Sequence, residues 1–302
     1  MTDQLDPPLP PPPEPGTDAP AHPRADPLIA AARSAGAREL DLSGLRLTEV
    51  PEALRALTGL VKLDLGGNRL THVPDWLGGL RDLRWLHLRY NRLTAVPACL
   101  GELEALAWLS LRGNTLTTLP ADICGRLAKL TRLDLDANRL TALPTPLGRL
   151  TALRRLGLAG NRLTALPEST GDLAALRWLT ARDNLLDTVP DSLGRLSDLR
   201  SLDLRGNRLQ TVPATLGRLG ALTDLNLSSN LLTSVPDALG DLAALAKLNL
   251  SGNQLTHLPR TFANLTALTE LNVVANPLES APAPLHPLIR ETPHSDTLPL
   301  WR

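Results

Sequence analysis

The chain has 302 residues, with 31 basic and 31 acidic side chains, so its balanced charge gives no indication of a nucleic-acid or membrane partner. Aromatic residues make up only 2% of the chain while leucine is abundant, which indicates many small equivalent cores instead of one large core. The N-terminus lacks a basic start followed by an apolar core, and no run of about 18 apolar residues occurs. We therefore expect a soluble, cytoplasmic protein without a secretory signal or a membrane span.

Two details of composition bear on the source and the redox environment of the protein. Arginine far outnumbers lysine, and alanine and proline are abundant, which is typical of a GC-rich bacterial genome. The sequence has two cysteines, Cys99 and Cys124, which are too few for a disulfide framework. Because disulfides are rare in the cytosol, we expect two reduced and partly buried thiols.

The residues that precede the repeats fall into two parts. Residues 1–25 are rich in proline, and we expect a solvated polyproline II or disordered tail, with a ligand for a proline-binding module as the alternative. Asp26 followed by Pro27 is typical of a helix start, and Gly36 is typical of a helix end. We therefore predict a helix over residues 26–36, with Leu28 and Ile29 on its apolar face. This helix would cap the open end of a repeat array.

A repeat of 23 residues, with one interval of 24, fills residues 37–290. Each copy reads L-x-x-L-x-L-x-x-N-x-L and ends in a half that begins with proline; a degenerate first copy has Leu45 where the asparagine belongs. The repeated asparagines are Asn68, Asn91, Asn114, Asn138, Asn161, Asn184, Asn207, Asn230, Asn253 and Asn276. Such a period is the signature of a solenoid. The one extra residue falls near Cys124 and Gly125, where we expect a loop to absorb it.

The chemistry of one copy predicts its local structure. The segment L-x-x-L-x-L is a short strand whose leucines face inward and whose other side chains face outward. The asparagine amide can donate and accept, so stacked copies form an asparagine ladder that satisfies backbone groups which would otherwise be buried and unpaired. Proline ends the strand, and the second half of the copy returns the chain on the outer side. One copy cannot bury its leucines alone, so neighbouring copies stabilise one another.

The text LPxxLGxLxxLxxLxLxxNxL resembles the leucine-rich repeat superfamily, and within it the intracellular class of Ras-associated scaffold proteins and their plant and bacterial relatives. The resemblance covers residues 37–290. It implies an α/β-type repeat solenoid: a curved horseshoe of about 11 repeats with a parallel concave sheet and an irregular or short-helical convex side. That class includes scaffolds, GTPase regulators and bare repeat proteins, and no GTPase, kinase or ligase domain accompanies the repeats here.

The repeat pattern ends after Pro282. Leu285, Leu288 and Ile289 are available to cover the last core, and residues 291–302 form a C-terminal tail. A recognisable cap is lacking. We therefore expect a monomer with a locally packed end, with a weak end-to-end dimer as the alternative.

Catalytic and metal-binding motifs are absent from the sequence. It has no glycine-rich phosphate loop, no HExxH and no paired CxxC. Asp64, His87 and Ser110 fall in adjacent strands in the order of a catalytic triad, but nothing suggests an oxyanion hole and a flat sheet offers no pocket. Asp134 and Asp136 supply too few ligands for a hard cation. We expect no enzyme activity, no metal and no cofactor.

The informative residues are the outward-facing positions of the strands. Four of the seven aromatic residues lie there, and from the copy at Leu83 to the copy at Leu199 ten arginines oppose four aspartates, an excess of six positive charges. Trp, Tyr and Arg dominate binding hot spots, although tryptophans packing on arginine stems would give the same pattern. The candidate partner-binding residues, which we name the Arg/Trp patch, are Trp85, His87, Arg89, Tyr90, Trp108, Arg112, Arg132, Arg155, Trp178, Arg182 and Arg205. The last third of this face, with an asparagine column at positions 226, 249 and 272, is expected to be neutral.

These observations favour a non-enzymatic scaffold for protein–protein interaction, in intracellular signalling, that holds the acidic and apolar surface of a protein partner on its concave face. The first alternative is binding of a polyanion or single-stranded nucleic acid by the Arg/Trp patch, against which the zero net charge argues. The second is a structural module that self-associates through its C-terminal end. A hydrolase at Asp64, His87 and Ser110 is the weakest of these hypotheses.

Overall fold

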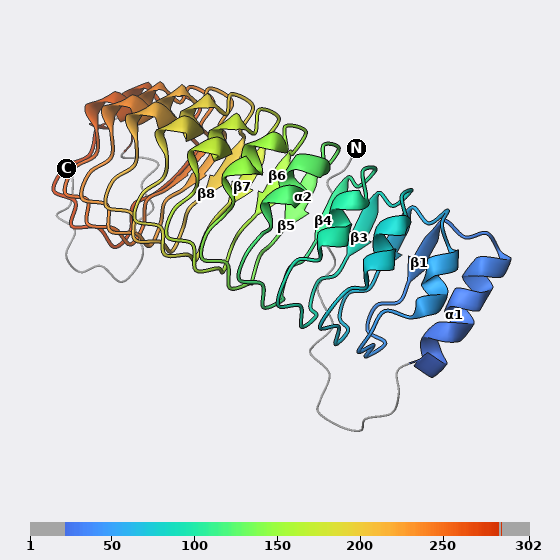
Figure 1. Ribbon diagram of the computed structural model, residues 1–302. Helices are drawn as coiled ribbons and strands as arrows, with labels where there is room; N and C mark the ends of the chain where they lie inside the picture. Colours follow the sequence, from blue (N-terminus) through green and yellow to red (C-terminus); the bar gives the residue numbers. More distant parts are fainter. Residues whose placement is uncertain (1–21, 284, 286–302) are drawn as a thin grey trace.

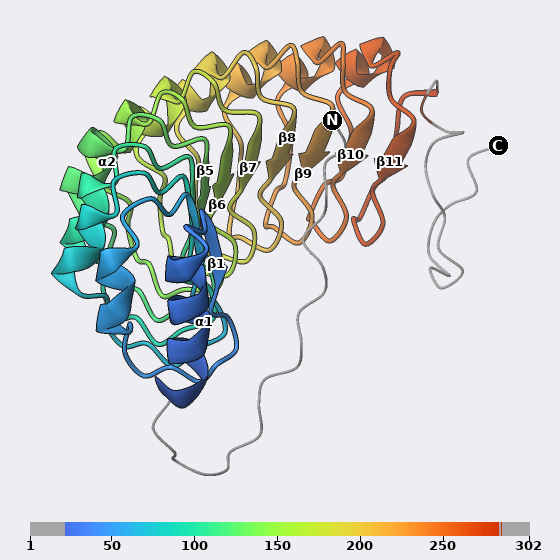
Figure 2. The same cartoon turned by 90° about the vertical axis from the view of Figure 1, so that its right-hand side faces the viewer.

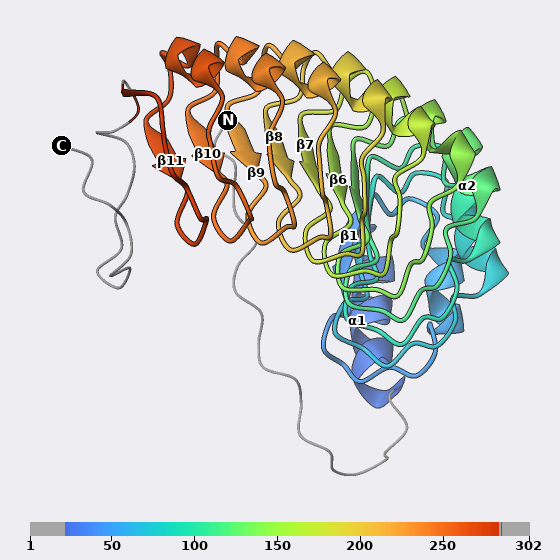
Figure 3. The ribbon, with the colours of Figure 1, turned by 90° about the vertical axis from the view of Figure 1, so that its left-hand side faces the viewer.

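The computed structural model describes residues 22–283 and 285, which form a single curved solenoid (Figure 1). The predicted tail over residues 1–25 and the predicted tail over residues 291–302 lie outside the described residues, except for the short stretch from residue 22 to 25. Strands line one side of the arch and short helical pieces line the other, as Figures 2 and 3 show from two sides. The predicted horseshoe with a concave parallel sheet is confirmed.

One parallel sheet runs the length of the solenoid, and its strands follow one another in sequence order. Each strand has three residues and pairs in register with the same positions of the next copy, as Leu63 does with Leu86. The strands are β1 (Glu39–Asp41), β2 (Lys62–Asp64), β3 (Trp85–His87), β4 (Trp108–Ser110), β5 (Arg132–Asp134), β6 (Arg155–Gly157), β7 (Trp178–Thr180), β8 (Ser201–Asp203), β9 (Asp224–Asn226), β10 (Lys247–Asn249) and β11 (Glu270–Asn272). Equivalent side chains of successive copies therefore form straight rows across the concave face.

The convex side is built from 3₁₀ turns that begin after the repeated proline. In the copy at Pro74 the proline is extended, with φ −70° and ψ 148°, and the Leu77 amide donates to its carbonyl at 3.0 Å. The 3₁₀ helices are η1 (Glu52–Ala56), η2 (Asp75–Gly79), η3 (Ala98–Glu102), η4 (Thr145–Arg149), η5 (Glu168–Asp172), η6 (Asp191–Arg195), η7 (Ala214–Arg218), η8 (Asp237–Asp241) and η9 (Arg260–Asn264). Proline fixes φ and donates no hydrogen bond, so each strand-to-turn transition occurs at the same place.

We expected a loop to absorb the extra residue near Cys124, but a short helix accommodates it instead. The copy that contains it has a six-residue α-helix, α2 (Ala121–Arg126), where the others have a five-residue 3₁₀ turn. The Leu127 amide bonds to the Ile123 carbonyl, four residues back, whereas the equivalent Leu150 bonds to Leu147, three residues back. An α-turn holds more residues per hydrogen bond than a 3₁₀ turn, so the insertion is accommodated without disturbing the neighbouring strands.

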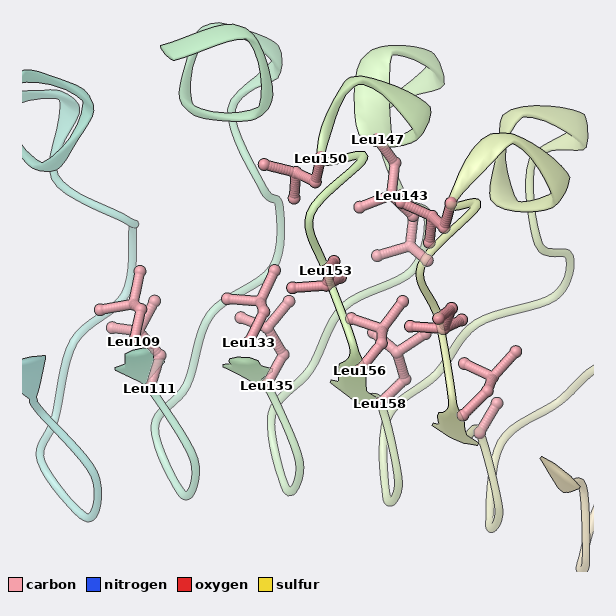
Figure 4. Close-up of a cluster of buried hydrophobic side chains, with 14 of the residues drawn as sticks. Leu109, Leu111, Leu133, Leu135, Leu143, Leu147, Leu150, Leu153, Leu156 and Leu158 are labelled. Carbon is pink, nitrogen blue, oxygen red and sulfur yellow. The ribbon is translucent and has the colours of Figure 1, made fainter. Parts of the chain in front are cut away.

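The core lies between the sheet and the helical turns. Figure 4 shows Leu133, Leu135, Leu156 and Leu158 below the turns that carry Leu147 and Leu150, each stacked on its equivalent in the next copy. Nearly all of these leucines are fully buried. A fully buried leucine contributes about 2 kcal/mol relative to an exposed one, so the stacked leucines are the main stabilising term of the solenoid.

The repeated asparagines form the predicted ladder of hydrogen bonds between adjacent copies. Asn161 accepts a hydrogen bond from the Leu140 amide of the preceding copy at 3.0 Å. Its side-chain amide donates to the Leu135 carbonyl of that copy and to the Leu158 carbonyl of its own, each at 3.0 Å. The other nine asparagines of the ladder make the same three bonds. Each side chain thus joins two adjacent coils where the backbone is buried and has no strand partner.

The residue before each ladder asparagine has a left-handed backbone, and its identity alternates along the solenoid. Glycine and non-glycine residues follow each other strictly: Gly67, Tyr90, Gly113, Ala137, Gly160, Asp183, Gly206, Ser229, Gly252 and Ala275, all with φ between 52° and 67°. The reason is steric at two places, because a Cβ on Gly113 would lie 2.6 Å from the ring of Tyr90, and one on Gly206 would collide with the Asp183 carboxylate. At these two places the glycine turn accommodates the side chain of the turn before it, whereas Cβ atoms on Gly67, Gly160 and Gly252 would make only ordinary contacts.

The N-terminal helix α1 (His22–Ser34) begins four residues earlier than the predicted helix. Pro27 lies inside it and costs one hydrogen bond near its start. Its buried face is formed by Ala25, Ile29 and Ala32, whereas Leu28 is 43% exposed, so the expected apolar position of Leu28 is wrong. Gly36, with φ 58°, turns the chain away, and α1 packs against β1 and η1 at the blue end of Figure 1.

Candidate interaction surface on the concave face

The sheet register places five residues of the Arg/Trp patch in one continuous row. Trp85 on β3 pairs with Trp108 on β4, which pairs with Arg132; Arg155 and Trp178 follow on β6 and β7. All three tryptophans are half-buried, so each ring packs on the protein with one part and faces solvent with the other. The row therefore presents apolar rings and guanidinium groups side by side, at a spacing of about 4.8 Å per strand.

Trp108 is held by charged or polar neighbours on two strands. The guanidinium carbon of Arg132 lies 5.0 Å from the centre of the Trp108 ring, within the range of a cation–π contact. The His87 ring meets Trp108 edge-on, with 4.7 Å between ring centres and 69° between planes. The orientation of Trp108 is thus fixed before any partner binds, which lowers the entropy cost of using it as an anchor.

His87 lies beneath this surface instead of on it. Its exposed fraction is 7%, and its Nδ1 lies 3.1 Å from the Asp64 carboxylate. Burial alone raises the pKa of Asp64, but hydrogen bonds from His87 and the Gly66 amide, with the charges of His87 and Arg89, outweigh burial and lower it. The expectation that His87 contacts a partner directly does not fit this burial; the ring instead supports Trp108.

A second group of side chains held by hydrogen bonds consists of Tyr90, Arg112 and Asp136. Arg112 donates from Nε to the Tyr90 hydroxyl at 2.8 Å and from Nη1 to Asp136 at 3.2 Å. Asp136 also accepts from the Ala159 amide at 2.7 Å. Burial, together with the nearby Asp134 carboxylate, raises the pKa of Asp136 to about 6. Arg112 is therefore fixed in position, and part of its charge is neutralised by Asp136.

The remaining arginines divide into paired and free groups. Arg89 lies 3.5 Å from Asp64, and Arg182 lies 3.9 Å from Asp183. Within the described part of the chain, no carboxylate forms an ion pair with Arg132, Arg155 or Arg205, and the last two are exposed. The charge available to a partner is thus concentrated in the middle of the patch, beside Trp108 and Trp178.

The catalytic arrangement is not formed. The Ser110 hydroxyl donates to Asp134 at 3.2 Å instead of to His87. The His87 Nε2 atom is buried without a hydrogen-bond partner, and Ser110 is itself 3% exposed. Asp64, His87 and Ser110 are thus neighbouring polar groups with separate partners, and a hydrolase at this place is not supported.

Metal and thiol chemistry give no further site in the described residues. Over residues 22–283 there is no group of three or more His, Cys, Asp or Glu side chains that could hold a metal ion. Cys99 and Cys124 are both free and buried, and burial raises the pKa of each thiol to about 11. Nor does any helix in this part of the chain have the length and apolar character needed to cross a bilayer.

A hollow lies outside the predicted patch, on the last third of the concave face. It has a volume of about 360 Å³ and is lined by strands β8 to β11. Its acidic side chains are Asp203, Asp224 and Glu270 and its basic side chain is Lys247, a difference of two negative charges. We expected a neutral surface here from the asparagine column, but four charged side chains line the hollow. The sequence signal for the hollow is the run of short side chains, serine and asparagine, in adjacent rows.

Family profiles match most of the chain. The profile described as "Leucine-rich repeat region" matches residues 75–165 and 164–280, and "Leucine rich repeat" matches residues 36–93. No curated protein matches the chain.

Three solved structures illustrate the likeness. The ectodomain of the Arabidopsis thaliana receptor kinase GASSHO1/SCHENGEN3, in complex with CASPARIAN STRIP INTEGRITY FACTOR 2, is 29% identical with a TM-score of 0.68, over 80% of this chain and 33% of the receptor. The plant peptide hormone receptor RGFR1, in complex with RGF2, is 29% identical with a TM-score of 0.50, over 81% of this chain and 49% of the receptor. An internalin (inlF) of Listeria monocytogenes, at 21% identity and a TM-score of 0.55, covers 84% of this chain and 87% of its own, and shows the fold alone.

This chain thus spans a third to a half of the plant receptors it resembles. The repeat period, the asparagine ladder, the continuous parallel sheet and the family matches agree: the chain belongs to the leucine-rich repeat family.

Proposed function

We propose that the protein is a non-enzymatic scaffold that binds a partner protein through the Arg/Trp patch. The row Trp85, Trp108, Arg132, Arg155 and Trp178 carries this proposal, because it places half-exposed rings beside unpaired guanidinium groups on one rigid face. Aromatic anchors surrounded by arginine are the typical composition of a binding hot spot. The partner surface is acidic with an apolar anchor, since it must complement both kinds of group.

The structural neighbours support a protein or peptide as the partner. Two plant receptors with the same fold are complexes, one with CASPARIAN STRIP INTEGRITY FACTOR 2 and one with RGF2. The finer assignments belong to this proposal as well: a cytoplasmic, bacterial protein of the Ras-associated type, acting in signalling. These rest on the consensus LPxxLGxLxxLxxLxLxxNxL and on composition.

The test compares proteins that co-purify with the wild type and with the double variant Trp108→Ala, Trp178→Ala, identified by mass spectrometry. Each replacement should cost about 2 kcal/mol or more of binding free energy while leaving the thermal unfolding midpoint nearly unchanged. Arg155→Ala should weaken binding too, whereas Arg139→Ala is the matched control, because Arg139 is exposed beside the ladder and outside the patch. Partners that bind the double variant as tightly as the wild type would overturn the proposal.

The second candidate is a polyanion or single-stranded nucleic acid, favoured by the unpaired Arg132 and Arg155 next to stackable rings. Its affinity for an oligonucleotide would fall steeply with added salt, because binding releases condensed counterions. Salt-tolerant binding of a protein partner excludes it. Self-association, the remaining alternative, would appear in sedimentation as a mass that rises with concentration.

A further inference from the structure

The hollow over β8–β11 has a row of outward-facing hydrogen-bond donors. Asn226 accepts a bond on Oδ1 from the Ser228 amide at 3.1 Å and from the Ser228 hydroxyl at 2.7 Å. Asn249 is held in the same way by Ser251, and Asn272 by the Val274 amide. Oδ1 of each side chain is occupied by a backbone donor and all three residues line the hollow, so the Nδ2 groups are the donors left for a ligand there.

These three amides have no acceptor in the described part of the chain. They lie on adjacent strands, in register, as the pairing of Asn226 with Asn249 and of Asn249 with Asn272 shows. In β8 the same position is Asp203, whose Oδ1 accepts from the Arg205 amide and whose second oxygen takes the place of the Nδ2 group. The row thus changes from an acceptor at β8 to donors at β9, β10 and β11.

The charged side chains of the hollow are also distributed unevenly between its β8 end and its β11 end. Lys247 and Glu270 neutralise each other at 3.4 Å. Asp203 and Asp224 remain, and among the described residues neither forms an ion pair; a Thr223 hydroxyl donates to Asp224 at 2.6 Å. The charges of Arg182 and Arg205 act on Asp203 without forming an ion pair with it, so the β8–β9 end holds two carboxylates without an ion-pair partner in the described part of the chain, while the β9–β11 part is neutral and rich in donors.

We propose that this hollow binds an extended segment of a partner protein, with a basic side chain between Asp203 and Asp224 and main-chain carbonyls on Asn226, Asn249 and Asn272. An extended main chain offers carbonyl acceptors, and a basic residue supplies the missing counter-charge. Four strands at about 4.8 Å span about 14 Å, the length of four to five extended residues.

The inference rests on the proposed function only in that both concern the concave face, since the residues are different and the charge preference is opposite. The Arg/Trp patch selects acidic surfaces, whereas this hollow selects a basic segment. The double variant Trp108→Ala, Trp178→Ala should therefore leave binding to the hollow unchanged, so failure of one proposal is distinguishable from failure of the other.

The experiment follows the side-chain amide signals of the ¹⁵N-labelled full chain by NMR during titration with a capped heptapeptide of alanine and proline that carries one central arginine. Signals of Asn226, Asn249 and Asn272 are assigned from the single Asn→Asp variants. The arginine peptide should shift these three signals, and the same peptide with glutamate in place of arginine should not. Equal shifts with both peptides, or no shift with either, would contradict the proposal.

Two variants test the two halves of the interaction. Asn249→Ala removes the side chain held by Ser251, and with it the outward donor, without adding a charge, and should weaken binding of the arginine peptide by about tenfold. Asp203→Asn with Asp224→Asn should remove the preference for arginine over glutamate. Asp187→Asn, an exposed carboxylate outside the hollow, is the matched control and should bind as the wild type does. Unchanged binding by Asn249→Ala would contradict the assignment of the donors.

Discussion

The Tyr90 hydroxyl accepts a 2.8 Å hydrogen bond from the Nε atom of Arg112, one strand away. Tyr90 reaches this position from a left-handed backbone, with φ 53°, that costs a non-glycine residue about 1 kcal/mol. The ring lies over Gly113, where no side chain competes with it. A strained backbone is thus maintained by a contact that positions an arginine of the Arg/Trp patch.

Tyr90→Phe removes the hydroxyl and leaves the ring. We expect it to lower the free energy of unfolding by about 1 kcal/mol, because the lost bond joins a cationic donor to a partly exposed acceptor. Urea unfolding measures the change, and Tyr90→Gly serves as the comparison because glycine relieves the backbone strain while losing the same bond. A midpoint for Tyr90→Phe equal to that of the wild type would mean that Asp136 alone positions Arg112.

Asp136 gives a pH dependence whose sign is opposite to that of an ordinary ion-paired carboxylate. Its folded pKa, about 6, lies above its ordinary value of 3.8, so the folded protein binds more protons than the unfolded chain between these values. Stability from this group is therefore greatest below about pH 4 and is lost as the pH rises through 6. Asp64, whose pKa is lowered, acts in the opposite direction and only below its ordinary value.

Asp136→Asn should flatten the decline in stability between pH 4 and 7 relative to the wild type. The amide keeps an oxygen for the Ala159 amide but does not titrate. Urea unfolding of both proteins at pH 4.5 and 7 makes the comparison, in which all other titrating groups cancel. If the two proteins show the same pH slope, Asp136 titrates at its ordinary value in the folded state.

The ladder asparagines should differ in energy by position. Asn161→Ala leaves the Leu140 amide and the Leu135 and Leu158 carbonyls without partners in a buried site, and should cost about 3 kcal/mol or more. Asn276→Ala removes the same three bonds at the half-exposed C-terminal copy, where water can replace them, and should cost about 1 kcal/mol. If calorimetry or urea unfolding gives equal losses in the free energy of unfolding for the two variants, burial does not determine how much a ladder asparagine stabilises the protein.

Two glycines of one copy form a matched pair on the convex side. A Cβ on Gly217 would collide with the Ala238 carbonyl of the next copy, so Gly217→Ala should lower the free energy of unfolding by about 2 kcal/mol. Gly220 has open space and no left-handed backbone, so Gly220→Ala should be neutral or stabilise by about 0.5 kcal/mol. A neutral Gly217→Ala would mean that adjacent 3₁₀ turns separate without cost.

The architecture followed from the sequence because nearly every leucine and asparagine of the repeat has an equivalent in the next copy. The spacing of Leu83, Leu86 and Leu88 alone assigns the inward side of a strand. The candidate site was less predictable because its geometry depends on pairs of different residues in neighbouring copies. His87 is flanked by Asp64 from the preceding copy and by Trp108 from the next copy. Its burial therefore cannot be predicted from the sequence of its own copy.

One feature that the sequence analysis missed could have been found by comparing side-chain volumes, and another could not. The hollow lies where the outward residues are short, and the sequence shows this at positions 201, 226, 249 and 272 once side-chain volumes are compared along rows. The start of α1 could not be placed, because Asp26 and Pro27 are good first residues for a helix and packing of Ala25 against the first copy favoured a longer one.

The alternation of glycine with larger residues before the ladder asparagines sets the unit in which this solenoid can change length. Removing two adjacent copies rejoins a glycine turn to a non-glycine turn, as in the native order, whereas removing one copy joins two turns of the same kind. Loss of the copy with Gly113 would place Tyr90 directly before Ala137, where we expect the Ala137 Cβ to meet the ring as a Cβ on Gly113 would. A shortened array that keeps Tyr90 next to a glycine turn should therefore be more stable than one that lacks only the copy with Gly113.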